Sequence, residues 1–96
     1  MDYRLDFTER ALSDLSEIVG AIALDDEDAA SRFGSAMLDH VELLRRFPRM
    51  GPAIHARSQV RKLAHSPINI YYKVREEKGV VDILHFRHGS RRSPKF

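Results

Sequence analysis

The stretch INIYYKVREEKGVVDILHFRH, residues 68–88, carries the strongest structural signal in the chain. Apolar side chains occur at every second position from Ile68 to Val74, which is the period of two that a half-buried β-strand shows. The segment EEKG at 76–79 has the composition of a hairpin turn, and the apolar run that follows it predicts a second strand over 80–88. This stretch therefore predicts an antiparallel hairpin of two strands.

Strict alternation along the second strand places Leu84 and Phe86 on one face and Ile83, His85 and Arg87 on the other. On the first strand, one face carries an aromatic ring and two cations. These residues are Tyr71, Lys73 and Arg75. If the two polar faces coincide, they form a cationic patch that can hold phosphate and stack a base. The alternative is a solvated sheet face.

Toward the N-terminus, alternation over residues 2–7 predicts a first strand, and Thr8 can then cap a helix that ends near Leu24. The apolar stripe of this helix has three- and four-residue spacing. Its members are Leu12, Leu15, Ile18, Val19 and Ile22. The acids of DDEDAASRF open a second helix, whose first turn they suit electrostatically. Its stripe is Ala29, Ala30, Phe33, Met37, Val41 and Leu44, with Phe47 as an extension.

Residues 49–58 are expected to form a loop, and residues 59–65 a short basic strand. The element order is therefore β-α-α-β-β-β. It predicts an α+β domain in which a helical hairpin covers one face of a mostly antiparallel four-stranded sheet. The whole chain, 1–96, is expected to be one domain, with residues 89–96 as a mobile tail.

Charge divides the chain into two halves. Residues 1–48 hold five Arg and eleven acids, whereas residues 49–96 hold eleven Arg or Lys and three acids. The net charges are 5 − 11 = −6 and 11 − 3 = +8. This asymmetry predicts either an anionic partner for the second half or internal pairing of acidic helices with a basic sheet.

Several classes of function are disfavoured by composition. The chain has no Cys, so it has neither a disulfide framework nor a thiolate metal site. No apolar run of membrane-spanning length and no signal peptide are apparent, so we expect a cytoplasmic protein without a membrane partner. His85 and His88 lie three apart on a strand and make a poor metal pair, so no metal and no cofactor are expected. Metal-free RNA cleavage would need a His base, and His65, His85 and His88 do not easily converge.

The ordered set of segments resembles the RelE/ParE superfamily of bacterial toxins. The matching segments are YRLDFTERALSDLSEI, AASRFGSAMLDHVELLRRFPRMGPAI, VRKL, INIYYKV and VVDILHFRHGSRR. The resemblance implies a helical hairpin on an antiparallel sheet, which is the order derived above. It also implies the toxin of a type II toxin–antitoxin system, silenced by a cognate antitoxin protein with which it can form a hetero-oligomer.

Two branches of this superfamily imply different targets. RelE-like members cut mRNA on the ribosome, and in this chain Arg61 and Arg87 match their basic residues, with His85 as the base. Position 89, where some members keep a catalytic His, is Gly, and no Tyr follows Arg87. The ending ILHFRHG and the segment FPRMG resemble the ParE-like branch more closely, whose members inhibit DNA gyrase without being enzymes.

The sequence therefore predicts a ParE-like gyrase inhibitor. His88, Arg91 and Arg92 are the expected target-binding residues, because they end the last strand and open the basic tail. The antitoxin is expected to bind along Arg57, Arg61 and Lys62. Two alternatives remain open: a RelE-like endonuclease that acts on mRNA at the ribosome, and a family member that only binds its antitoxin.

Overall fold

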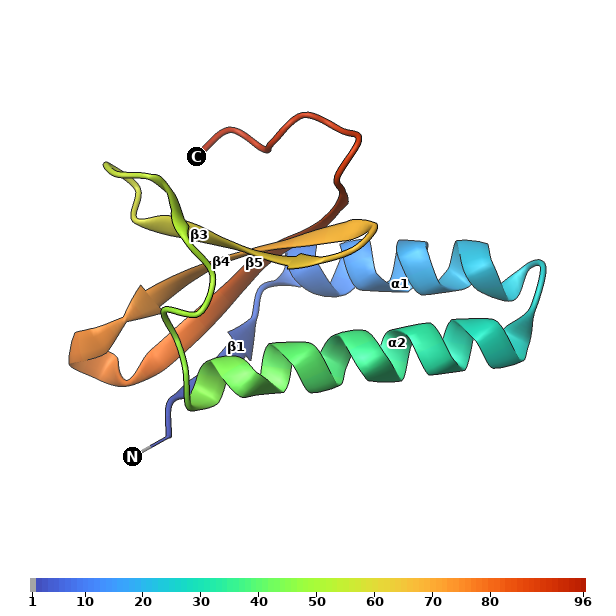
Figure 1. Cartoon of the computed structure of the whole chain (residues 1–96), viewed down its shortest axis with the longest axis horizontal. Coiled ribbons are helices and arrows are strands. Elements are labelled where there is room, and N and C mark those ends of the chain that lie inside the picture. Colours follow the sequence, from blue (N-terminus) through green and yellow to red (C-terminus); the bar gives the residue numbers. More distant parts are fainter. Residues whose placement is uncertain (1) are drawn as a thin grey trace.

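The helices and strands follow the order that the hydrophobic patterning predicts. The computed structural model describes residues 2–96. Its elements are β1 (Arg4–Phe7), α1 (Glu9–Ala23), α2 (Glu27–Glu42), η1 (Leu43–Arg45), β2 (Ala53–His55), β3 (Val60–His65), β4 (Ile68–Arg75), η2 (Glu76–Lys78) and β5 (Val80–His88). The two α-helices form a hairpin on one side of the sheet and extend past the ends of the strands (Figure 1). The α+β class and the layer order are thus confirmed.

The sheet has five strands in the order β1-β5-β4-β3-β2, one more than expected. Only β1 pairs in parallel, with β5, and the other pairs are antiparallel. The additional strand, β2, falls within 49–58, which the sequence predicts to be a loop. Its three residues are all exposed, so they show no apolar alternation from which a strand could be predicted. No helix within residues 2–96 has the length and apolar character to cross a membrane.

Side chains cap both helices where the sequence predicts their first turns. Thr8 Oγ1 accepts a hydrogen bond from the backbone N of Ala11 at 3.1 Å, and Asp26 Oδ1 accepts one from Ala29 at 3.0 Å. Thr8 also donates to the carbonyl oxygen of Ile83 at 3.0 Å. Thr8 therefore links the start of α1 to β5 at the point where β1 ends.

The register of β4 on β5 corrects the expected face assignment of the last strand. Tyr71 lies opposite His85, but Tyr72 lies opposite Ile83, so β5 contains one extra residue at this point. Such a bulge reverses the alternation on one side of it. Ile83 and Phe86 consequently both belong to the core, although strict alternation places them on opposite faces.

The core also corrects the two helical stripes. Ala11 is completely buried, whereas Leu12 is 52% exposed. The small Ala side chain faces the sheet, and Leu15 and Ile18 follow it on the same helix face. Phe47 is 54% exposed because the chain tightens into η1 before it, which moves residue 47 out of the phase of α2.

Leu43 and Leu44 provide a matched pair for testing this packing. Leu44 is fully buried and Leu43 is 44% exposed, although both lie in η1. We expect Leu44→Ala to lower the free energy of unfolding by about 2–5 kcal/mol, since it leaves a cavity. Leu43→Ala should cost less than about 1 kcal/mol. Urea denaturation followed by circular dichroism measures both values, and equal losses would contradict the assigned core.

Candidate functional site

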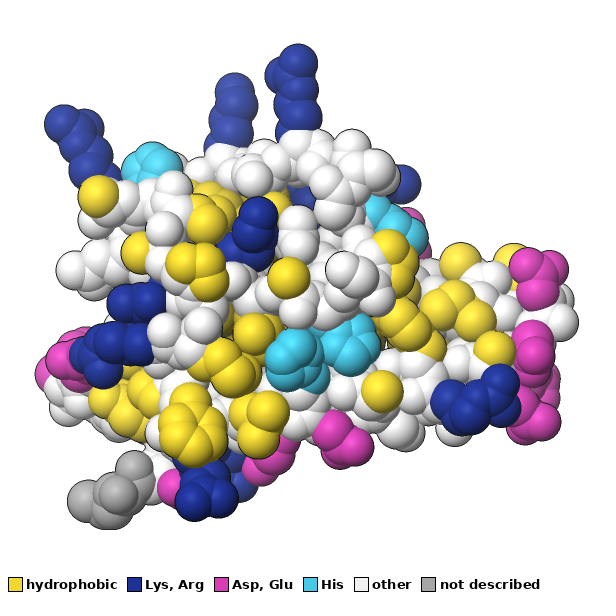
Figure 2. Space-filling view, viewed as in Figure 1, with side chains coloured by type: hydrophobic (Ala, Val, Ile, Leu, Met, Phe, Trp, Pro, Cys, Tyr) yellow, Lys and Arg dark blue, Asp and Glu magenta, His cyan; other side chains and the backbone are white. Residues whose placement is uncertain are grey.

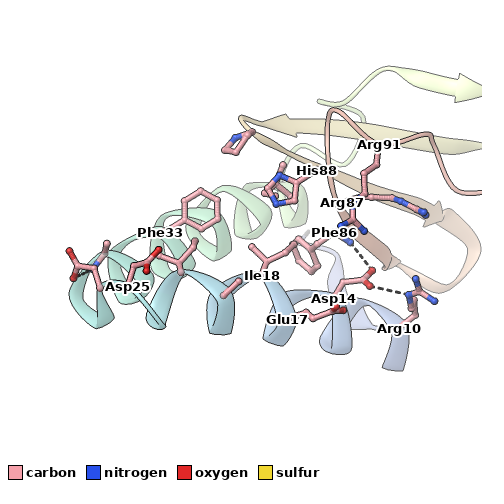
Figure 3. A pocket seen from close by; sticks show the side chains of 16 residues that line it. Arg10, Asp14, Glu17, Ile18, Asp25, Phe33, Phe86, Arg87, His88 and Arg91 are labelled. Carbon is pink, nitrogen blue, oxygen red and sulfur yellow. Dashed lines mark hydrogen bonds and ion pairs between the residues drawn. The ribbon is translucent and has the colours of Figure 1, made fainter.

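A groove of about 740 Å³ lies between the helical hairpin and the end of the sheet. Its floor is apolar, with Ile18 and Phe33 from the helices and Ile68 and Phe86 from the strands. Figure 3 shows that Phe33, Ile18 and Phe86 line this floor along the inner side of the hairpin. The groove exists because the hairpin extends past the strands, so part of its apolar face has no sheet to cover it.

The walls of the groove carry opposite charges. The helical wall has Asp14, Glu17 and Asp25, and the sheet wall has Arg87, His88 and Arg91. Figure 3 shows the acidic groups along the helices and the basic groups on the strand and the start of the tail. Arg10 is the exception, since it lies on the helical side beside Asp14. This arrangement suits an amphipathic segment with one basic and one acidic edge.

Asp14 connects α1 to the open edge of β5. Its Oδ2 accepts a hydrogen bond from the backbone N of Phe86 at 3.2 Å, and its Oδ1 accepts one from Arg10 Nε at 2.9 Å. The Nδ1 atom of His85 lies 3.4 Å from the same Oδ2. Asp14 therefore satisfies a strand N–H just beyond the end of β1. Sequence reasoning missed it, because 72 residues separate Asp14 from its backbone partner.

His85 is held in a partly buried position. Burial lowers the pKa of its imidazole below the ordinary value, and the Asp14 carboxylate offsets this only in part. The ring of Phe96 also meets the His85 ring edge-on, with centroids 5.8 Å apart. His85 is therefore neutral at neutral pH, with its Nδ1 side directed at a carboxylate.

The face of the sheet turned away from the helices is here called the outer face. At the open edge of β5 it adjoins the groove, so Arg87 belongs to the outer face by register and also borders the groove. Tyr71 pairs with His85, and Asn69 pairs with Arg87. The polar faces of the two hairpin strands therefore coincide, which is the condition for the cationic patch predicted from the sequence. Lys62 of β3 also pairs with Tyr71, so the ring has cations on neighbouring strands. The outer face therefore carries a basic patch around an aromatic ring.

The C-terminal tail covers this ring. Tyr71 is only 2% exposed, because Ser93 Oγ lies 3.2 Å from its hydroxyl and the Phe96 ring centroid lies 5.5 Å from its own. Figure 1 shows the tail running back over the strands. The mobility of residues 89–96 stays a prediction, but their position determines whether Tyr71 can reach a ligand.

The structure separates the residues expected to bind the antitoxin. Arg61 pairs with the buried Tyr72, so it lies on the helical face, where its Nη1 donates to the Gly51 carbonyl at 2.8 Å. Lys62 lies on the outer face, and Arg57 is exposed in the turn between β2 and β3. The separation of Arg61 from Lys62 could have been predicted from the sequence, since adjacent residues of a strand point to opposite faces of the sheet. These three residues do not form one surface.

The expected target-binding residues lie closer together. His88 ends β5, and the backbone N of Arg91 donates to the His88 carbonyl at 3.1 Å. His88 and Arg91 share the basic wall of the groove, and Arg92 is exposed beside them. The residues expected to cut RNA are not brought together, because Arg61 lies on the opposite face from His85 and Arg87.

Charge in the folded protein is segregated rather than neutralised. Figure 2 shows acidic side chains gathered at the tip of the helical hairpin and basic ones mainly on the sheet side. Within residues 2–96, the ion pairs between the two halves of the sequence are Arg75 with Asp6 at 3.9 Å and His85 with Asp14. Lys62, Lys73, Arg87, Arg91 and Arg92 make no ion pair with the described acids. The basic half is thus left available to an anionic partner.

Fold and surface together define a small α+β domain with a basic sheet and an uncovered groove. Comparison with known protein families gives one match: the family described as "ParE toxin of type II toxin-antitoxin system, parDE" matches residues 5–93. The chain belongs to this ParE family of toxins, which confirms the superfamily that the sequence resembles.

Solved structures show the same fold at low sequence identity. The chromosomal ParDE toxin–antitoxin system of P. aeruginosa has a chain that superposes with a TM-score of 0.75 at 20% identity, covering 90% of this chain and 95% of that one. A chain of the RelBE2 toxin–antitoxin complex of Mycobacterium tuberculosis gives 0.71 at 21% identity, with coverages of 92% and 99%. A mutant RelE toxin of E. coli in the free state gives 0.59 at 22% identity, with coverages of 94% and 86%. No curated protein sequence matches significantly.

The lowered pKa of His85 predicts a dependence of stability on pH. A base whose pKa is lower in the folded protein binds fewer protons there than in the unfolded chain. The contribution of His85 to stability is complete above the pKa of a His in the unfolded chain, which is about 6.5. This contribution is lost as the pH falls from there through the pKa of His85 in the folded protein. We expect the free energy of unfolding to fall between about pH 7.5 and pH 5.5, and to fall less in His85→Gln. Urea midpoints across this range measure both slopes, and identical slopes would contradict the assignment.

Proposed function

We propose that this toxin inhibits DNA gyrase by binding it, and that it does not cleave RNA. The observation that carries the proposal is the register of β3, which puts Arg61 on the helical face. A phosphate held by Arg87 and attacked with the help of His85 would lie on the outer face, out of reach of Arg61. RNA cleavage requires a base, an acid and cations around one phosphate. The binding function needs only an accessible surface.

The accessible surface that supports binding is formed by His88, Arg91 and Arg92. All three are exposed at the end of β5 and the start of the tail. Arg guanidinium groups pair strongly with carboxylates and phosphates, so these residues can contact acidic groups of gyrase or the DNA that it holds.

A second candidate function, RNA cleavage, is favoured by one observation. Asp14 lies beside the Nδ1 atom of His85, an arrangement that can orient an imidazole so that Nε2 takes a proton. Arg87 and Lys62 lie on the same outer face and could hold the phosphate. For RNA cleavage, the tail would have to move away from Tyr71 so that the ring could contact the RNA. Arg61 could not help to hold the phosphate, because it lies on the other face.

The two candidates predict opposite mutant profiles. With purified gyrase and relaxed plasmid, we expect the protein to block supercoiling, and Arg91→Ala/Arg92→Ala to weaken the block by about tenfold or more. Lys95→Ala is the matched control, because Lys95 is an exposed tail cation outside the proposed contact. His85→Gln should keep its activity once circular dichroism shows that it is folded.

The opposite profile would support cleavage. Primer extension on mRNA from cells that produce the toxin would then show cuts, and His85→Gln would abolish both the cuts and the growth arrest. A double Arg variant that remains fully toxic would refute the proposed gyrase contact. A wild-type protein that neither inhibits gyrase nor cuts mRNA would indicate a family member that only binds its antitoxin.

We further propose that a cognate antitoxin neutralises the toxin by laying an amphipathic segment in the groove. The apolar floor of Ile18, Phe33 and Phe86 supports this placement, since a partner segment would bury it. The basic wall would attract acidic side chains of that segment. Occupation of the groove would also cover His88 and Arg91, which explains how binding could silence the toxin.

Ala21 offers a direct test of the groove. It is exposed and lines the groove, whereas Ser16 is an exposed residue of the same helix outside it. We expect Ala21→Arg to weaken antitoxin binding by about tenfold or more, because the long side chain fills the groove. Ser16→Arg should bind like the wild type. Isothermal titration calorimetry with the purified antitoxin measures both, and equal affinities would place the antitoxin elsewhere.

A further inference from the structure

Two histidines that neither the groove nor the outer face uses lie in contact where the helical layer meets the sheet. His40 is near the end of α2 and His65 ends β3. Their Nδ1 atoms are 2.9 Å apart, and their ring centroids are 5.1 Å apart. Both side chains are partly exposed. Figure 2 shows two touching His side chains on the surface at this junction.

The two rings are held in place by their surroundings. Phe33 meets His65 edge-on, with centroids 5.7 Å apart at 70°, and it packs against the core. Burial, together with the neighbouring His40, lowers the pKa of His65, so this imidazole is neutral at neutral pH. The two Nδ1 atoms face each other, so one must carry a hydrogen and the other a lone pair. When both imidazoles carry their hydrogen on Nε2 instead, each Nδ1 has a lone pair, and a metal ion can then bind both atoms.

We propose that His40 and His65 together bind a divalent transition-metal ion through their two Nδ1 atoms. Imidazole nitrogens bind such ions at about 2.0–2.1 Å, so two ligands at a right angle are about 2.9 Å apart. A tetrahedral angle would require about 3.3–3.4 Å. The observed separation of 2.9 Å fits the right-angled geometry of Cu²⁺ or Ni²⁺ better than that of tetrahedral Zn²⁺.

The protein supplies two of the ligands, and water completes the coordination. Among residues 2–96, no group of three or more His, Cys, Asp or Glu side chains has the arrangement of a metal site. The ion would link α2 to β3, residues that are 25 apart in the sequence. Because the unfolded chain does not hold the two imidazoles together, the ion binds the folded state preferentially and stabilises it.

The test uses the full-length protein purified without a polyhistidine tag. CuCl₂, NiCl₂ and ZnCl₂ are titrated at pH 7.5 by calorimetry, and thermal unfolding is followed with and without each ion. We expect one ion per chain, a raised melting temperature, and tighter binding of Cu²⁺ and Ni²⁺ than of Zn²⁺. The electron paramagnetic resonance spectrum of the Cu²⁺ complex should show coupling to two imidazole nitrogens. Binding should be lost near pH 5, where protons compete for the nitrogens.

The variants His40→Gln and His65→Gln should each weaken Cu²⁺ binding by about tenfold or more. His55→Gln is the matched control, since it removes an exposed His opposite Val60, at the other end of β3 from His65, and it should bind like the wild type. Circular dichroism checks that each variant is folded. A wild-type spectrum without two-nitrogen coupling, or an affinity unchanged in both pair variants, would overturn the proposal, as would a loss confined to His55→Gln.

Discussion

The pairing of β4 with β5, with one extra residue in β5, determines which side chains of the last strand face the core and which face the outer surface. Before the bulge, Val81 and Ile83 point to the helices; after it, Phe86 does. The same shift places His85 opposite Tyr71 and Arg87 opposite Asn69 on the outer face. Without the bulge, the residues after it would change faces: Phe86 would point to water, and His85 and Arg87 would point to the core. The bulge therefore makes one strand serve both the core and a basic surface.

The bulge is stabilised by residues from the other end of the chain. Thr8 donates to the Ile83 carbonyl, and Asp14 accepts from the Phe86 N–H. These two contacts replace strand pairing where β1 ends, so the edge of β5 is not left with unsatisfied polar groups. They also attach the first half of α1 to β5. The hairpin extends past the strands beyond this attachment, which leaves the groove uncovered (Figure 1).

The bulge and the strand register distribute the cations of the basic half over two surfaces. Cations that do not pair with acids gather on the outer face and along the sheet wall of the groove, and the three residues of a plausible cleavage site are divided between two faces. A shared fold does not decide between these functions, because they depend on a few side chains and not on the arrangement of elements. The features that bear on this distinction are the face on which Arg61 lies, the position of the tail over Tyr71 and the contact of Asp14 with His85.

The sequence by itself determined the order and type of the longer elements, the Thr8 cap of α1 and most of the core, because these follow from local periodicity and from hydrogen bonds within one turn. It also separated the acidic helices from the basic strands. Only the tertiary structure decided the bulge in β5, the short strand β2, the contact of Asp14 with β5 and the pairing of His40 with His65. Each of these joins residues that are distant in the sequence or too few to show a period, so no local pattern records them. Which cations share a surface was decided in the same way, by strand register.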